Sequence, residues 1–154
     1  LYVFDIDQSG NPEEVLERFD NDVKPTVISD IEVYEYANQT GETIAYAVPF
    51  TGAGLWGSIS GYMGVTADFS QVTGLVFTDH SETPGLGGRI DELTYREQFK
   101  DLSISPDTQL AYGEAGDNQI DAITGATSTS NAVLRILNQL LTDTISELEE
   151  AAND

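Results

Sequence analysis

A stripe of apolar residues near the C-terminal end of the chain constrains the fold more than any other feature of the sequence. Its members recur at spacings of three and four residues, which places them on one face of an α-helix. They are Val133, Leu137, Leu140, Leu141, Ile145 and Leu148. We therefore predict a long C-terminal helix whose apolar face packs against the rest of the chain.

Two pairs of apolar segments earlier in the chain are typical of β-hairpins. The first pair, Ile31–Tyr36 and Thr43–Val48, flanks a turn-like Asn-Gln-Thr-Gly sequence at residues 38–41. The second pair, Ile59–Thr66 and Val72–Thr78, flanks a short turn of its own. The sequence therefore predicts at least four strands that are joined locally.

Helical and irregular segments surround these strands. Asn11, Pro12 and the two glutamates that follow predict an N-cap and the first turn of a short helix to about Phe19. We expect a loop over 80–88, a helix over 91–101 and irregular or weakly extended chain over 103–121. Hairpin-joined strands with helices mainly at the two ends indicate an α+β fold: a largely antiparallel sheet, flanking helices and a long C-terminal helix.

The composition excludes several kinds of site and partner. The chain has no cysteine, which excludes disulfides and thiolate-bound metals or clusters. Its 27 acidic and 6 basic residues give a net charge of −21, which repels nucleic acid and anionic lipid headgroups. The chain has no run of about 18 apolar residues, so the sequence predicts no transmembrane helix. Because the chain begins at Leu1 and not at methionine, we expect a signal or membrane anchor to precede it in the full-length protein.

Three short motifs resemble known sites but lack a required feature. Asp5–Gly10 resembles the start of a calcium-binding EF-hand loop, but Leu16 stands where the bidentate glutamate is needed, so we predict a turn before a helix. Gly85–Gly88 lacks the spacing of a dinucleotide-binding fingerprint. His80 is the single histidine, and no nucleophile elbow surrounds any serine. We interpret His80 as a structural residue, and a hydrolase is the weakest functional alternative.

Four consecutive hydroxyl-bearing residues, Thr-Ser-Thr-Ser at 127–130, directly precede the helical stripe. The first N–H groups of a helix lack partners, and its dipole places about half a positive charge there, so such an end binds phosphate readily. The small residues Gly125 and Ala126 allow a ligand close to the backbone. Two interpretations are open on these grounds. Either one hydroxyl caps the helix and the others lie in a loop, or several of them bind or esterify a phosphate.

The segment Asp121–Thr127, with the sequence D-A-I-T-G-A-T, resembles the flavinylation motif of the FMN-binding domain family. In that motif an aspartate leads, a serine or threonine precedes Gly-Ala-Thr, and the last threonine carries FMN. Ala122 departs from the glycine or serine that is common there, but it is also small. His80–Gly88 resembles a second block of the family, and Gly54–Gly57 with a Gly-Tyr pair shortly after it resembles a third. The three blocks occur in family order.

The resemblance implies one FMN-binding domain over residues 1–154, with no metal site and no catalytic residue of its own. Thr127 is expected to hold FMN through a phosphoester, and Asp121 is expected to belong to the signal that a separate flavin transferase reads. Trp56, Thr83 and Leu86 are expected to pack on or beside the flavin ring, and Glu82 to orient its loop or to hydrogen-bond the flavin. The remaining expected FMN contacts are Gly85, Gly87, Thr124, Gly125, Ala126, Ser128, Thr129 and Ser130.

Known members of the family include the C subunit of the sodium-translocating NADH:quinone reductase and the G subunit of the Rnf electron-transport complex. The resemblance therefore implies a domain that relays electrons to or from other subunits of a membrane respiratory complex, on the extracytoplasmic side. Two alternatives remain open. One is a stand-alone extracytoplasmic FMN-binding electron carrier, and the other is a flavin-free module that binds an anion or a phosphate at the helix end.

Arg89 directly follows the expected flavin loop and is one of only six basic residues. Two interpretations are open for it. A position facing the flavin ring would stabilise negative charge on the reduced cofactor, whereas pairing with Asp91 or Glu92 would leave it as an ordinary surface residue.

Overall fold

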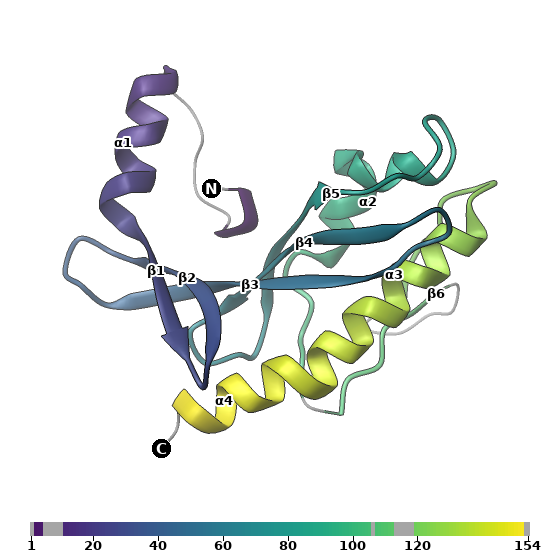
Figure 1. Cartoon of the computed structure of the whole chain (residues 1–154). Helices are drawn as coiled ribbons and strands as arrows, with labels where there is room; N and C mark the ends of the chain where they lie inside the picture. Colours follow the sequence, from purple (N-terminus) through teal and green to yellow (C-terminus); the bar gives the residue numbers. More distant parts are fainter. Residues whose placement is uncertain (1, 5–10, 106, 113–118, 153–154) are drawn as a thin grey trace.

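The computed structural model describes residues 2–4, 11–105, 107–112 and 119–152, and its central element is a five-stranded antiparallel sheet (Figure 1). The strands follow one another in the sheet as they do in the chain: β1 (Val23–Ile28), β2 (Ile31–Ala37), β3 (Thr43–Ala53), β4 (Ser58–Thr66) and β5 (Val72–Asp79). The pairs β2–β3 and β4–β5 are the two predicted hairpins, which the structure confirms.

Strand β1 was not predicted from the sequence. Its sequence, V-K-P-T-V-I, buries Val23 alone and so lacks the alternation of apolar and polar residues that marks a strand. Pro25 has no N–H group to donate, which the sheet tolerates because β1 lies at its edge and pairs with β2.

Strand β3 continues beyond the predicted end at Val48 as far as Ala53, and it pairs with β4 over that whole length. The turn between them therefore projects from one end of the sheet. Gly54 at its start donates its N–H to the carbonyl oxygen of Gly57 at 2.7 Å. This extension carries the Gly-Leu-Trp-Gly block to the end of the molecule where the C-terminal helix begins.

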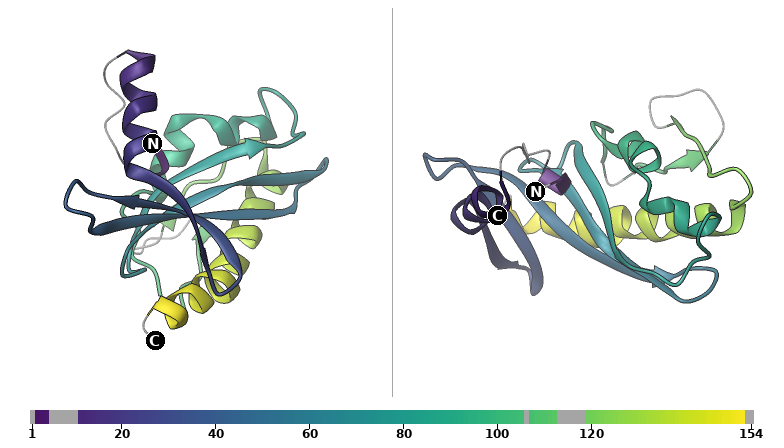
Figure 2. Two further views of the ribbon diagram at one scale, coloured as in Figure 1. Left: turned by 60° about the vertical axis from the view of Figure 1, so that its left-hand side comes forward. Right: turned by 90° about the horizontal axis from the view of Figure 1, so that it is seen from above.

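Alternate residues of the strands supply two separate cores, one on each face of the sheet. In Figure 2 the C-terminal helices lie on one side of the sheet and the N-terminal turn on the other. Val48 and Met63 belong to the larger core, which the C-terminal helix covers. Ala45 and Ala47 belong to the smaller core on the opposite face, where the short turn η1 (Tyr2–Phe4) packs. Alternation of side chains along a strand is what allows one sheet to have both.

The C-terminal helical rod consists of α3 (Thr127–Gln139), a π-helical turn η4 (Leu140–Ile145) and α4 (Ser146–Ala152). It runs across one face of the sheet (Figure 1). All six residues of the predicted stripe are buried, and Leu137 and Leu148 have no exposed surface. Burial of each such leucine contributes about 1.5–3 kcal/mol. The long C-terminal helix is therefore confirmed, with a π turn that the periodicity did not indicate.

The N-terminal helix α1 (Pro12–Asp22) begins where the sequence predicts and extends beyond the expected end at Phe19. Asn11 caps it by accepting the N–H of Glu14 at 3.0 Å, and the Glu14 carboxylate accepts the N–H of Asn11 at 3.2 Å. The EF-hand-like stretch Asp5–Gly10 lies outside the described residues. No helix in the described part of the chain is long and apolar enough to span a membrane.

The chain between β5 and α3 forms short pieces. The segment predicted as a helix over 91–101 is helical but divided among η2 (Gly87–Asp91), α2 (Leu93–Arg96) and η3 (Glu97–Phe99). The described residues after it are mostly irregular, as expected, apart from the two-residue parallel strands β6 (Ala111–Tyr112) and β7 (Gln119–Ile120). These pieces bring the 80–88 loop beside the start of α3.

Candidate functional site

Helix α3 begins directly after a tight turn. The N–H of Ala126 donates to the carbonyl oxygen of Ile123 at 3.0 Å, and Gly125 within that turn has φ +80°, a conformation that favours glycine. Ala126 occupies the N-cap position, and no side chain caps the helix there. The expected alternative in which one hydroxyl caps the helix is therefore wrong. The helix presents uncapped N–H groups and the positive end of its dipole.

The four hydroxyl-bearing residues have different environments. Thr127 and Ser128 are exposed, while Thr129 and Ser130 are buried. The Ser130 hydroxyl oxygen accepts the N–H of Ile123 at 3.1 Å, which ties the turn to the helix. The Thr129 hydroxyl donates to Glu82 at 2.9 Å. Two hydroxyls thus fix the local structure, and two are free to meet a ligand.

Glu82 connects all three motif blocks. It is only 5% exposed, and its Oε1 accepts the Leu55 N–H at 2.9 Å as well as the Thr129 hydroxyl. Its Oε2 accepts the Trp56 N–H at 3.0 Å. The 80–88 loop, the β3–β4 turn and the start of α3 therefore meet at one carboxylate. Of the two roles expected for Glu82, these contacts fit the orientation of loops.

A cavity of about 430 Å³ lies where the three blocks meet. Its volume falls in the range of about 300–1,000 Å³ that is typical of small-molecule sites. Three large apolar side chains are unusually exposed around it, with exposed fractions of 52% for Leu55, 66% for Trp56 and 50% for Leu86. The full lining is Leu55, Trp56, Thr83, Leu86, Gly87, Gly125, Ala126, Thr127, Ser128 and Thr129.

The cavity brings together most of the residues expected to bind FMN. Nine of its ten lining residues were expected, and Leu55 is the addition. Leu55 lies in the Gly-Leu-Trp-Gly block beside Trp56, so that block was the signal that marks it. Of the other expected residues, Glu82 lies behind the cavity wall, Ser130 is buried in the helix start, and Thr124 and Gly85 are not part of the lining.

The composition of the cavity fits FMN. The uncapped start of α3, with the exposed hydroxyls of Thr127 and Ser128, suits a phosphate group. The apolar surfaces of Leu55, Trp56 and Leu86 suit a flat aromatic ring system. The lining therefore includes groups suited to the phosphate and groups suited to the ring.

His80 is a structural residue, as interpreted from the sequence. Its Nε2 lies 2.6 Å from Oδ2 of Asp91, and its Nδ1 accepts the backbone N–H of Glu82 at 3.2 Å. Because Nδ1 accepts, this geometry assigns the ring proton to Nε2, which donates to Asp91. Both ring nitrogens are engaged and neither meets a serine hydroxyl in the described part of the chain. Among the described residues, His80 therefore forms no base–nucleophile pair with a serine.

Asp121 and Arg89 lie together and are not part of the lining of the cavity between the three motif blocks. They line a second, shallow cavity of about 300 Å³, together with Thr124 and Gln98. The side-chain amide of Gln98 holds the backbone of Asp121 in both directions, accepting its N–H at 2.6 Å and donating to its carbonyl at 3.3 Å. Asp121 itself is exposed. Its carboxylate therefore projects from a fixed backbone next to the turn that precedes α3.

Arg89 pairs with Glu92 at 3.0 Å, and the two side chains are 41% and 48% exposed. It is not part of the lining of the cavity between the three motif blocks. Of the two interpretations of Arg89, the structure supports the surface ion pair, and the ring-facing alternative is not observed.

Two tyrosines form a hydrogen-bonded chain that ends at the start of α3. The Tyr112 hydroxyl donates to the carbonyl oxygen of Ser130 at 2.7 Å, so the Tyr95 hydroxyl, 2.8 Å away, is the donor to Tyr112. Burial, followed by the neighbouring Tyr112, raises the pKa of Tyr95 well above its ordinary value. Burial also raises the pKa of Tyr112.

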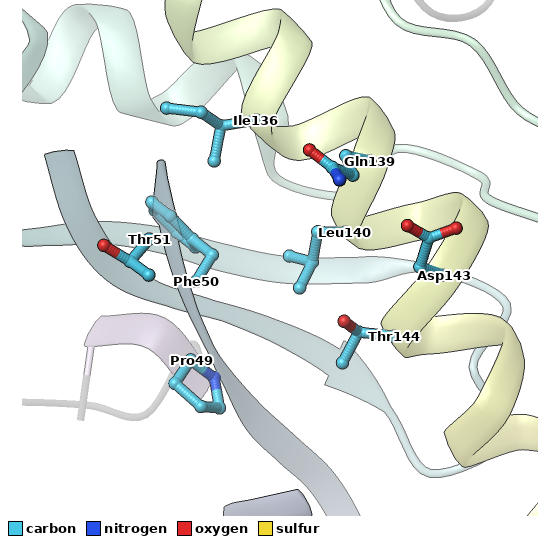
Figure 3. A pocket seen from close by; sticks show the side chains of 8 residues that line it. All are labelled: Pro49, Phe50, Thr51, Ile136, Gln139, Leu140, Asp143 and Thr144. Atoms are coloured by element: carbon cyan, nitrogen blue, oxygen red, sulfur yellow. The ribbon is translucent and has the colours of Figure 1, made fainter. Parts of the chain in front are cut away.

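A further cavity, of about 300 Å³, is lined by residues of β3 and of the C-terminal helical rod (Figure 3). It is lined by Pro49, Phe50, Thr51, Ile136, Gln139, Leu140, Asp143 and Thr144. Its one charged residue, Asp143, is acidic, and α3 and η4 pass it side-on without presenting a helix start. This cavity is therefore poorly suited to a phosphate, and none of the expected site residues lines it.

Comparison with known proteins places the same region in a family. The family model described as the FMN-binding domain matches residues 54–142. The C subunit of the Na⁺-translocating NADH-quinone reductase of Pasteurella multocida is 38% identical over 109 residues, which is 66% of this chain and 42% of that protein. The G subunit of an ion-translocating oxidoreductase complex of Methanosarcina acetivorans is 37% identical over 119 residues, 77% of this chain and 59% of that protein. The chain thus spans about half the length of these relatives.

Solved structures confirm the fold. The crystal structure of Shewanella oneidensis NqrC matches with a TM-score of 0.83 at 21% identity, covering 99% of this chain and 95% of that one. The C subunit of the Na⁺-translocating NADH-quinone reductase from Parabacteroides distasonis matches with a TM-score of 0.75 at 24% identity, covering 96% and 87%. At these identities the likeness concerns the arrangement of the sheet, the flanking helices and the long C-terminal helix.

The matched region includes the β3–β4 turn, the 80–88 loop and the start of α3, which are the three segments that line the cavity of the candidate site. It covers more than half of the chain. This match favours FMN over the alternative of a flavin-free anion-binding module. The chain belongs to the FMN-binding domain family, and FMN is its cofactor.

Proposed function

We propose that this chain carries FMN esterified to the hydroxyl of Thr127 and transfers electrons within a membrane redox complex of the sodium-translocating NADH:quinone reductase or Rnf type. The observation that carries the proposal is the position of Thr127. It is the exposed first residue of an uncapped helix, and it lines the cavity that the three motif blocks enclose. The relatives described above are named as subunits of such complexes.

The residues of the cavity have separate tasks in this proposal. The N–H groups at the start of α3 and the Ser128 hydroxyl stabilise the phosphate oxygens, and Leu55, Trp56 and Leu86 position the ring and exclude water from one face of it. FMN, when bound, supplies the reversible uptake of electrons. The protein supplies placement, a nonpolar contact surface and the local electrostatic field.

A covalent bond suits the charge of the chain. With a net charge of −21, the protein repels a dianionic phosphate at long range and so weakens reversible binding of FMN. Attachment by a separate flavin transferase that uses FAD and a divalent metal ion avoids this difficulty. A bond forms between Thr127 Oγ1 and the FMN phosphorus, the pyrophosphate bond of FAD breaks, and AMP and the hydroxyl proton leave.

Mass spectrometry of protein coexpressed with a flavin transferase tests the attachment. The wild-type chain is expected to gain the mass of FMN minus water and to retain it after denaturation, and Thr127→Ala is expected to gain nothing. Ser128→Ala is the matched control, because it removes the neighbouring exposed hydroxyl and leaves the acceptor in place. Flavin that stays on denatured Thr127→Ala would place the acceptor elsewhere.

We further propose that the domain lies on the extracytoplasmic side, held there by an anchor in the full-length protein. Protease treatment of right-side-out vesicles that contain the full-length protein is expected to digest this domain without lysis. Protection until the vesicles are opened would place it in the cytoplasm. Copurification of other redox subunits with the tagged full-length protein distinguishes membership of a complex from a stand-alone FMN-binding carrier.

A further inference from the structure

We propose that Glu82 is a positioning residue of the flavin site, whose buried carboxylate joins the three segments around the cavity and keeps a negative charge behind the cavity wall. It does not line the cavity itself. The inference rests on the proposed location of FMN in this cavity, and its first test does not require FMN at all.

The contacts of Glu82 are of a kind that holds a carboxylate in one orientation. Both oxygens accept, from the backbone N–H groups of Leu55 and Trp56 and from the hydroxyl of Thr129, at 2.9–3.0 Å. Because every contact is an N–H or O–H donor, the ionised carboxylate satisfies all three. Hydrogen bonds to a charged group are stronger than bonds between neutral groups.

The chain leaves room for this carboxylate on two sides. A Cβ atom at Gly54 would lie 2.9 Å from Glu82 Oε1 and 2.7 Å from the Ile59 side chain. A Cβ atom at Gly87 would overlap the Thr129 hydroxyl that donates to Glu82. A glycine from the β3–β4 turn and one from the 80–88 loop therefore allow the close approach that the carboxylate needs.

The same contacts determine where the ring-binding side chains lie. Leu55 and Trp56 are more than half exposed, so the turn that carries them has little packing of its own to hold it. Their two backbone N–H groups are fixed by Glu82, so the carboxylate links the turn itself to the start of the helix that holds Thr127. Arg135 of α3, which donates to the carbonyl oxygen of Ala53, adds a second link one residue before the turn.

A negative charge at this place also affects the redox chemistry. The two ring-facing residues Leu55 and Trp56 donate their backbone N–H groups directly to Glu82, so the charge lies close behind the surface that the ring contacts. Electrons added to a flavin increase its negative charge, and a buried carboxylate nearby opposes that increase because little water screens it. Glu82 is therefore expected to lower the reduction potential of the bound FMN.

The first experiment measures hydrogen exchange of the Leu55 and Trp56 amides in the flavin-free protein. In Glu82→Gln, whichever way the amide is turned, its NH₂ group meets at least one N–H donor. Protection of the two amides is expected to fall by about tenfold or more, since a bond to a charged acceptor is lost. Glu92→Gln is the matched control, because it removes an equal charge from an exposed residue beside the same loop.

The second experiment measures the midpoint potential of the FMN-loaded protein by spectroelectrochemistry. Glu82→Gln is expected to shift the potential upward, and Glu92→Gln to leave it within error of wild type. Thr129→Val serves as the second variant if Glu82→Gln does not fold. It removes the hydroxyl that holds the Glu82 carboxylate to α3 but keeps the negative charge. Because the carboxylate is then held less firmly, protection of the Leu55 and Trp56 amides is expected to fall, without an upward shift of the potential.

The outcomes separate this inference from the proposed function. Unchanged protection of the Leu55 and Trp56 amides in Glu82→Gln overturns the positioning role, whether or not the protein carries flavin. An unchanged potential in Glu82→Gln, or an upward shift in both Glu82→Gln and Thr129→Val, overturns the electrostatic role. A wild-type chain without flavin on Thr127 would instead contradict the proposed attachment and leave the amide-exchange result standing.

Discussion

At the scale of single residues, neighbours of one chemical type have different roles at the start of α3. Ser130 closes the preceding turn, Thr129 binds Glu82, and Thr127 and Ser128 remain exposed at the cavity. Burial makes the difference, because a buried hydroxyl must find a partner within the protein whereas an exposed one is free to meet a ligand.

Arg89→Gln tests the surface role of Arg89. The midpoint potential of the FMN-loaded protein is expected to stay within error of wild type at low salt, since Arg89 pairs with Glu92 and is not part of the cavity lining. The free energy of unfolding is expected to change by about 0–1 kcal/mol.

Arg96→Gln provides the contrast to Arg89→Gln when the free energies of unfolding of both variants are measured in urea. Arg96 donates to the carbonyl oxygens of Asp91 and Leu75, and its guanidinium lies 4.6 Å from the centre of the Tyr2 ring. Its replacement is expected to lower the free energy of unfolding by about 1–3 kcal/mol.

For Arg89→Gln, a downward shift of the midpoint potential would instead indicate that Arg89 faces the flavin.

Asp121→Ala tests the proposed flavinylation signal. Because Gln98 holds the Asp121 backbone and the carboxylate is exposed, removal of the side chain is expected to leave the far-ultraviolet circular dichroism unchanged. The initial rate of flavin attachment, followed by in-gel fluorescence, is expected to fall strongly. Asp143→Ala, an exposed aspartate on η4, is the control. Loading of Asp121→Ala at the wild-type rate would remove this residue from the signal.

At the scale of elements, the start of α3 is held by segments distant in the sequence. Tyr95 of α2 donates to Tyr112 of β6, and Tyr112 donates to the Ser130 carbonyl inside the helix. The short helical pieces between β5 and β6 thus support the helix that presents Thr127. A shift of these pieces would move Thr127.

The raised pKa values of the paired tyrosines predict that the free energy of unfolding depends on pH under alkaline conditions. The pKa values of Tyr95 and Tyr112 are raised in the folded protein above the ordinary 10.0, so the unfolded chain loses these protons first. Their contribution to stability is fully present below about pH 10 and is lost as the pH rises above it, with a slope of at most about 1.4 kcal/mol per pH unit for each group.

Urea unfolding between pH 8 and 11.5 measures this effect. The wild-type free energy of unfolding is expected to decline above pH 10, and the decline is expected to be shallower in the double variant Tyr95→Phe, Tyr112→Phe. Equal slopes in the two proteins would assign the alkaline loss of stability to other groups.

At the scale of the whole molecule, the protein has two hydrophobic cores, one on each face of its sheet, and the chain has a large net negative charge. The C-terminal rod covers one face, and η1 packs on the other, where a side chain at Gly64 would overlap the Val3 carbonyl oxygen. The 27 acidic residues of the chain repel one another in the compact state.

Salt is therefore expected to stabilise the protein. Raising sodium chloride from 0.1 to 1 M shortens the Debye length from about 10 Å to about 3 Å and screens the repulsion, so the urea midpoint is expected to rise. Choline chloride at equal ionic strength is expected to give the same rise. A rise with sodium alone would indicate specific cation binding, and no rise with either salt would contradict the electrostatic explanation.

The sequence by itself determined the elements with strong local signals. The capping box at Asn11, the two hairpins and the stripe ending at Leu148 follow from patterns within a few residues of each other, because hydrogen bonding and side-chain periodicity act locally. The motif blocks also carried most of the cavity lining, including Trp56 and Thr127.

Only the tertiary structure decided how those motifs work together. Edge strand β1 forms because β2 is there to pair with it, and its sequence lacks the alternation that would be a local signal. Glu82 lies 27 residues from Leu55 and 47 from Thr129 along the chain, yet it binds both. Arg89 turns to Glu92 and not to the cavity. The physical reason is that burial and charge pairing depend on which segments the sheet brings together, and no pattern of neighbouring residues encodes that.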